Sequence, residues 1–183
     1  MKFIYINLLI FLFVFNGCSW LNFSKQTPQR TAIIPSVSLS RIIDQNRLFQ
    51  GGKIYVKFFQ PGVGVLANEQ SDKLSLMILR GIGVMINETS GSFQIILEEN
   101  YKEADLIIDG HLVEVGSTPK WHGWFMRPDK GSVEIKGRLY EKESGKVIAI
   151  FKEHMDFNRK KKSFEEIALI LGQNIGSFLL ESL

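Results

Sequence analysis

The sequence contains almost no cysteine: its 183 residues include one, Cys18. A single thiol cannot form an internal disulfide, so a folded domain of this chain must be held together by burial alone. An excess of one charge is also missing, because 22 Lys and Arg residues face 19 Asp and Glu residues and leave a net charge of +3. This mild balance does not predict nucleic-acid binding.

Signatures of catalysis and metal binding are absent from the sequence as well. There is no GxSxG motif, and Gly62 and Gly64 lack the spacing of a phosphate-binding loop. The three histidines, His111, His122 and His154, are scattered, and no third ligand stands at metal-binding spacing. We therefore expect no enzyme activity, no metal and no cofactor.

The sequence also has no hydrophobic run long enough to span a bilayer comfortably. The longest, residues 3–15, falls short of the ~20 residues that a transmembrane helix needs. It follows Lys2, has the length of a signal-peptide core and ends just before Cys18. This arrangement resembles a bacterial lipoprotein signal, which implies a signal peptide at residues 1–17 and a lipid on Cys18. An ordinary secretory signal with a chance cysteine and an uncleaved anchor are the alternatives.

The lipoprotein resemblance also implies a location. Several acyl chains on one cysteine anchor a protein durably, because each buried methylene contributes about 0.8 kcal/mol. Ser19 follows Cys18, in place of the Asp that retains many Gram-negative lipoproteins in the inner membrane. The resemblance thus implies attachment to the outer membrane on its periplasmic side. Polar residues 18–40 are predicted to be a flexible tether, and residues 41–183 a single periplasmic domain.

Hydrophobic periodicity in residues 41–183 predicts an α+β domain. The central strand is expected at residues 104–115, where Gly110 lies in the middle of an apolar face. Further strands are expected at residues 53–59, 93–97, 132–140 and 146–157, and helices at residues 71–87 and from residue 163 onward. The predicted order is β-α-β-β-β-β-α, with two helices on one face of a mainly antiparallel sheet. Residues 93–97 and 104–115 are expected to form a hairpin.

The last helix carries small residues at every fourth position, namely Ala168, Gly172 and Gly176. Small residues at this spacing let a neighbouring backbone approach closely. Charged residues on the same helix disfavour the alternative, dimerisation within a membrane. We expect this stripe to pack on the sheet over Gly110 and Gly137, which lie on the apolar faces of their strands.

Residues 52–183 resemble a recurring module of the bacterial envelope. The resemblance is carried by KIYVKFF, by SGSFQIILEENYKEADLIIDGHLVEV, by GSVEIKGRLYEKESGKVIAIF and by a capped final helix. Similar layouts occur in the amino-terminal domain of TolB, in the curli-secretion lipoprotein and in lipoproteins that activate penicillin-binding proteins. The resemblance implies a non-catalytic protein that contacts other envelope proteins or assembles with itself.

The most unusual surface segment is predicted at residues 116–130, GSTPKWHGWFMRPDK, which is expected to be a loop. Trp121, Trp124, Phe125 and Arg127 are of the types that dominate binding interfaces, so we predict that they contact a partner. In the alternative interpretation the loop folds back and its rings cover one end of the sheet.

Together these features predict a lipid-anchored, non-catalytic periplasmic module. Cys18 attaches it to the membrane, and it contacts another envelope protein during assembly, secretion or wall synthesis. One alternative is a homo-oligomeric structural subunit of an envelope complex. The other is a hydrolase or small-ligand binder whose site the sequence does not reveal.

Overall fold

The computed structural model describes residues 39–181, apart from residues 90, 97, 123 and 124. The predicted signal peptide, Cys18 and all but the end of the predicted tether lie outside the described residues. The described strands are β1 (Arg41–Ile42), β2 (Gly52–Val56), β3 (Gln60–Pro61), β4 (Phe93–Ile96), β5 (Leu106–His122), β6 (Phe125–Glu141) and β7 (Val147–Asn158). The helices are α2 (Gln45–Phe49), α3 (Glu69–Thr89), the 3₁₀ turn η1 (Glu98–Glu103) and α4 (Phe164–Glu181).

The strands form one seven-stranded mixed sheet in the order β1-β7-β6-β5-β2-β4, and β3 pairs with β5 as well. Strand β2 runs parallel to both β4 and β5, whereas β5, β6 and β7 are antiparallel. The α+β class is confirmed, but the prediction of a mainly antiparallel sheet is corrected. Parallel neighbours need a crossover, and α3 supplies it between β2 and β4.

The predicted hairpin between residues 93–97 and 104–115 does not form, because β2 lies between β4 and β5. The elements from β2 to α4 follow the predicted order β-α-β-β-β-β-α once β3 and η1 are left out. The elements β1, α2, β3 and η1 are additional to that order. Among the residues that the structure describes, no helix is long and apolar enough to cross a membrane.

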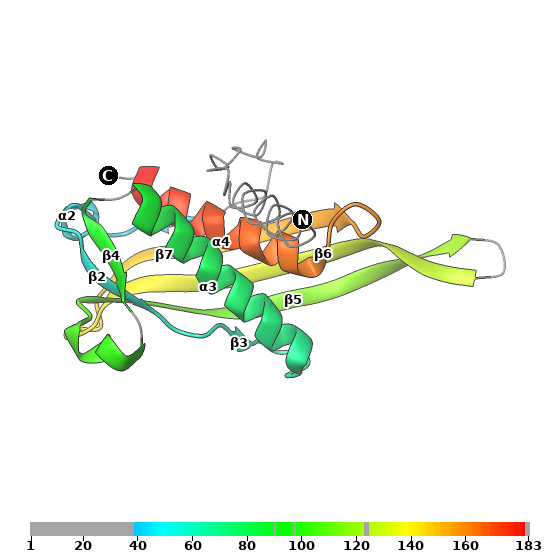
Figure 1. Ribbon diagram of the computed structural model, residues 1–183, viewed down its shortest axis with the longest axis horizontal. Helices are drawn as coiled ribbons and strands as arrows, with labels where there is room; N and C mark the ends of the chain where they lie inside the picture. Colours follow the sequence, from blue (N-terminus) through cyan, green and yellow to red (C-terminus); the bar gives the residue numbers. More distant parts are fainter. Residues whose placement is uncertain (1–38, 90, 97, 123–124, 182–183) are drawn as a thin grey trace, which may run out of the picture. The chain divides into compact units, whose positions relative to one another are not determined.

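The core lies between the sheet and the two long helices, which cover the same face (Figure 1). On β5 the predicted apolar face is buried, since Leu106, Ile108 and Leu112 have no exposed surface. Burial of residues at alternate positions is what a strand with one covered face requires. The prediction of two helices on one face of the sheet is therefore confirmed.

The small residues of α4 pack against α3 rather than against the sheet. A methyl group added at Gly172 would clash with the backbone carbonyl of Ile78, and one added at Gly81 with the carbonyl of Leu169. The two helix backbones thus approach too closely for a side chain at either position. The spacing correctly predicts close packing, but the expected neighbour is wrong.

The sheet glycines are covered by aromatic rings instead of a helix. The ring of Phe59 lies where a side chain at Gly110 would project, and the ring of Phe151 does the same at Gly137. The two ring centroids are 6.3 Å apart. The expected helix over Gly110 is therefore replaced by Phe59, because a ring laid on a glycine fills the same space at the sheet surface.

Both long helices begin with reciprocal side-chain caps. The Asn68 carboxamide oxygen accepts a hydrogen bond from the Ser71 backbone N–H at 3.1 Å, and α3 therefore begins earlier than predicted. At α4 the Ser163 hydroxyl accepts from the Glu166 N–H, and the Glu166 carboxylate accepts from the Ser163 N–H. This capping box accounts for the capped final helix that the sequence predicts.

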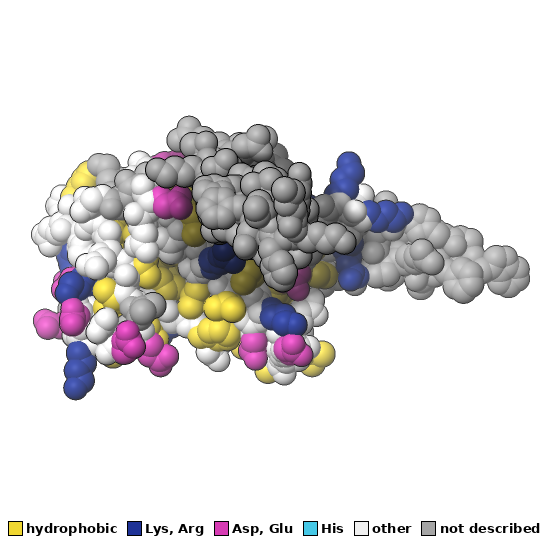
Figure 2. Space-filling view, in the orientation of Figure 1, with side chains coloured by type: hydrophobic (Ala, Val, Ile, Leu, Met, Phe, Trp, Pro, Cys, Tyr) yellow, Lys and Arg dark blue, Asp and Glu magenta, His cyan; other side chains and the backbone are white. Residues whose placement is uncertain are grey.

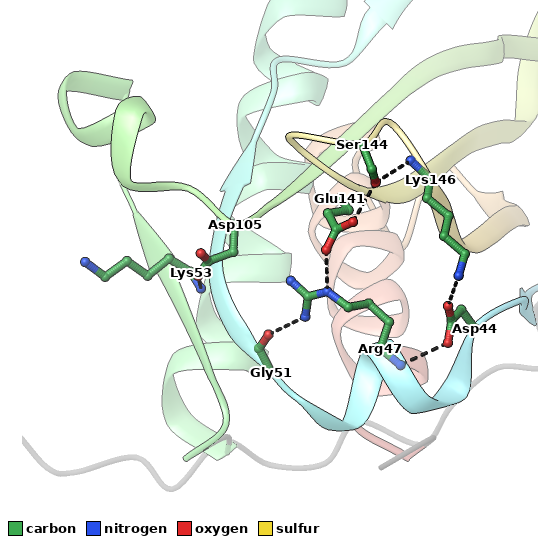
Figure 3. Close-up of polar contacts among 8 residues, drawn as sticks. All are labelled: Asp44, Arg47, Gly51, Lys53, Asp105, Glu141, Ser144 and Lys146. Carbon is green, nitrogen blue, oxygen red and sulfur yellow. Dashed lines mark hydrogen bonds and ion pairs between the residues drawn. The ribbon is translucent and has the colours of Figure 1, made fainter.

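The segment before β2 is fastened to the turn between β6 and β7 (Figure 3). Asp44 caps α2 and accepts a hydrogen bond from Lys146 Nζ at 2.6 Å. Arg47 donates to Glu141 Oε1 at 2.8 Å and to the Gly51 carbonyl at 3.0 Å. The contacts to Lys146 and Glu141 join residues 102 and 94 positions apart, and they therefore fix α2 against the end of the sheet.

Candidate functional site

The β5–β6 hairpin extends beyond the rest of the sheet. Strands β6 and β7 remain paired as far as Lys130↔Asn158, whereas β5 and β6 remain paired as far as His122↔Phe125. Within the described part of the chain, residues 117–129 therefore take part in no strand pairing beyond β5–β6. We call residues 117–129 the hairpin arm. Figure 1 shows it continuing past the ends of α3 and α4.

This arm corrects the prediction of a loop at residues 116–130. The segment contains Pro119, Pro128 and Gly123, residue types that usually interrupt strands. In the structure Pro119 and Pro128 are directly paired, next to a register shift between Thr118 and Pro119. A strand with one free edge tolerates proline, because the missing N–H costs no ladder hydrogen bond on that side.

The arm brings most of the predicted partner-binding residues close together in the backbone. Its last register pairs are Lys120↔Arg127, Trp121↔Met126 and His122↔Phe125. Trp124 lies between the two strands in sequence and is outside the described residues. The predicted lipidation site, Cys18, is outside the described residues as well. The backbone does not turn back over the end of the sheet, which disfavours the interpretation of the segment as a cover (Figure 1). A role in contacting a partner stays a prediction.

The root of the arm is basic. Lys130 pairs with Asn158, and the chain then continues through Arg159, Lys160 and Lys161, all of which are exposed. Figure 2 shows Lys and Arg side chains gathered where the arm leaves the body of the domain. The Arg159 guanidinium lies 5.2 Å from the centroid of the Phe164 ring, which positions it at the start of α4. The arm therefore emerges beside cationic groups suited to an acidic surface.

The sheet face opposite the helices holds a shallow hollow of about 660 Å³. Its lining comes from β2, from the segment that follows it, from η1 and from β5: Tyr55, Lys57, Phe58, Gln60, Glu98, Tyr101, Asp109, Gly110 and His111. Sequence reasoning missed this hollow, because it depends on η1 lying beside β2. The polar alternation of Tyr55 and Lys57 in the first strand was the available signal.

Two charged groups that line the hollow, Asp109 and Lys57, have side-chain partners. Arg138 binds both oxygens of Asp109, at 3.0 and 3.2 Å, and its guanidinium lies 4.9 Å from the centroid of the Tyr140 ring. Lys57 Nζ hydrogen-bonds to the Tyr140 hydroxyl at 3.0 Å, and this bond raises the pKa of Lys57 above its ordinary value. Burial raises the pKa of Tyr55. Lys57 thus stays protonated at neutral pH and is unsuited to act as a base or nucleophile.

No protein-family model and no curated protein matches the sequence. Solved structures share its fold. The PelC dodecamer from Paraburkholderia phytofirmans has a TM-score of 0.54 at 10% identity, over 79% of this chain and 97% of that chain. Protein XCC0632 from Xanthomonas campestris has a TM-score of 0.48 at 11% identity, over 72% and 85%. The lipoprotein GNA1162 from Neisseria meningitidis has a TM-score of 0.43 at 12% identity, over 71% and 99%.

At these identities the likeness concerns the fold alone. The predicted resemblance is therefore confirmed only as a fold shared with the PelC structure, and not as membership of a sequence family.

Proposed function

We propose that this chain is a lipid-anchored, non-catalytic module on the periplasmic side of the outer membrane, which contacts another envelope protein through the hairpin arm. The observation that carries the proposal is the extension of β5 and β6 beyond Lys130↔Asn158. A two-stranded ribbon is at best marginally stable in water by itself. A partner that covers the arm would bury its surface and so stabilise it, because no further strand of the sheet pairs with the arm.

The sequence of the arm supports the same role. Aromatic residues and Arg are the side chains that most often dominate binding energy. Trp121, Phe125 and Arg127 fall within the last few register pairs of the arm, and Trp124 follows at its tip in sequence. Their concentration at one end of the hairpin suits insertion of that end into a partner.

The lipid on Cys18 would hold the domain near the membrane while leaving the arm free to search for a partner. A flexible tether of the length of residues 18–40 has a root-mean-square span of about 25 Å. The arm is therefore proposed to act within a layer close to the membrane surface.

Photo-crosslinking in intact cells tests the contact. A photoreactive residue at Trp124 should give a discrete adduct with one envelope protein. The same residue at Leu66, which is 79% exposed and lies outside the arm, should give none. Equal adducts from the two positions, or none from Trp124, would contradict the proposal.

A second candidate is a homo-oligomeric structural subunit. It is favoured by the fold shared with PelC, whose structure is that of a dodecamer. The mass of the detergent-extracted protein, measured by light scattering, separates the two functions. A discrete multiple of the protomer mass with no other protein present favours the subunit, and a complex with a different protein favours the module.

A further inference from the structure

Three side chains of types that can bind a metal ion form a row across the sheet at the root of the arm. Glu114 of β5 is directly paired with Glu134 of β6, and Glu134 is directly paired with His154 of β7. Directly paired residues of antiparallel strands project from the same face at short distance. The three side chains therefore stand side by side on the face opposite the helices.

Their ligand atoms converge. One carboxylate oxygen from each glutamate and one nitrogen of His154 all lie within 4.8 Å of one another. His154 Nδ1 is 3.7 Å from Glu134 Oε2. Ligands bound tetrahedrally to Zn²⁺ at about 2.0–2.2 Å are roughly 3.3 Å from one another. Small side-chain movements would thus bring all three groups onto one ion.

The histidine is oriented as a ligand. Its Nδ1 atom is buried and has no hydrogen-bond partner among the described residues, which is costly for a polar atom. Its other nitrogen, Nε2, lies 3.5 Å from Asp156 Oδ1. A metal-binding histidine commonly places its second nitrogen against a carboxylate, which fixes the tautomer and the ring orientation. A metal bond would satisfy Nδ1.

The two glutamates of the row carry like charges at short distance. Like charges directly opposite each other destabilise a sheet, and Glu114 and Glu134 are such a pair. Lys152 Nζ contacts Glu134 Oε1 at 3.0 Å, and the Ser132 hydroxyl donates to Glu114 Oε1. These contacts orient both carboxylates.

We propose that Glu114, Glu134 and His154 bind a divalent transition-metal ion of the Zn²⁺ class, with a further coordination position open to water. The imidazole ligand selects such ions over Mg²⁺ and Ca²⁺, which prefer oxygen. The ion would join β5, β6 and β7 just before β7 ends and the other two strands continue as the arm. This site is independent of the proposed partner contact.

Calorimetry of the tag-free, lipidated chain in detergent, stripped of metal, tests the site. We expect one Zn²⁺ per chain and no binding of Mg²⁺ or Ca²⁺. His154→Ala and Glu134→Gln should each weaken Zn²⁺ binding at least tenfold. Asp156→Asn should weaken it by about 10- to 100-fold. His111→Ala is the matched control, because His111 is exposed on the same strand face outside the row.

Thermal unfolding with and without Zn²⁺ gives a readout that does not depend on titration heats. Zn²⁺ should raise the melting temperature of the starting protein and of His111→Ala, but not that of Glu114→Gln, a conservative change at an exposed position. Absence of Zn²⁺ binding, equal binding of Ca²⁺, or unchanged binding in both His154→Ala and Glu134→Gln would overturn the proposal.

Discussion

At the residue scale, Gly172 and Gly83 have opposite surroundings although both lie within helices. A side chain at Gly172 would meet the backbone of Ile78, whereas nothing lies within 4 Å of the corresponding position at Gly83. Backbone cannot move aside as a flexible side chain can. The free energy of unfolding should therefore depend on position rather than on the loss of glycine itself.

Gly172→Leu should lower the free energy of unfolding by about 1–3 kcal/mol, because overpacking forces α3 and α4 apart. Gly83→Ala should raise it by up to about 1 kcal/mol through helix propensity alone. Urea unfolding followed by circular dichroism measures both. Equal effects of the two substitutions would refute the close approach of the helices.

Two carboxylates that hold α2 also predict how stability depends on pH. The hydrogen bond from Lys146 lowers the pKa of Asp44 below its ordinary value of 3.8, and the hydrogen bond from Ser144 is the main cause that lowers the pKa of Glu141. A lowered folded-state pKa contributes stability above the ordinary pKa, and this contribution is lost as the pH falls through the folded-state value.

The variant Asp44→Asn with Glu141→Gln should consequently lose less stability than the starting protein as the pH falls below the ordinary carboxyl pKa values of 4.5 and 3.8. Glu143→Gln, in the same turn, is the control and should leave the acid dependence unchanged. Urea midpoints measured across this pH range give the comparison. Parallel pH curves for the double variant and the starting protein would contradict the assigned contacts.

At the scale of elements, the sequence predicted those features whose cause is local. The apolar face of β5, the strands β6 and β7 and the cap of α4 each depend on residues close in sequence, and each was found. The pairing of strands was harder to predict. The alternation of apolar and polar residues in β4 predicts which of its faces is buried, but not which strand lies beside it. The small residues of α4 similarly predicted that another backbone approaches this helix closely, but not that the neighbour is α3.

The functional features escaped prediction for the same reason. Glu114, Glu134 and His154 are separated by 20 residues at each step, and only the ladder register brings them into one row. The arm was not predicted as a pair of strands, because Pro119 and Pro128 are residues that usually interrupt a strand. Composition alone still marked residues 116–130 as the segment most suited to binding.

The arm should be separable from the stability of the domain. Trp121→Ala with Phe125→Ala should change the free energy of unfolding by no more than about 0.5 kcal/mol, as substitutions outside a core usually do. The same double variant should abolish the adduct from Trp124. Its urea midpoint and its adduct can be measured in parallel. Unfolding of the double variant would instead mean that these rings pack within the domain.

At the scale of the whole molecule, we propose a lipid on Cys18 at one end of the chain and a partner-binding arm formed by β5 and β6. Mass spectrometry of the mature amino terminus should find Cys18 as the first residue, carrying acyl chains. Cys18→Ala should leave the protein unprocessed or unlipidated, as its migration and extraction into detergent would show. An unmodified Cys18 within an intact chain would contradict the anchor.

The size of the complex that the chain forms in native membranes tests the proposed function most directly. The decisive comparison is with a variant in which residues 117–129 are replaced by a two-residue Asn-Gly turn, which suits a short hairpin. We predict that the variant keeps its cooperative unfolding, because the core residues remain, but loses the larger complex on native electrophoresis. A complex of unchanged size without the arm would contradict the account.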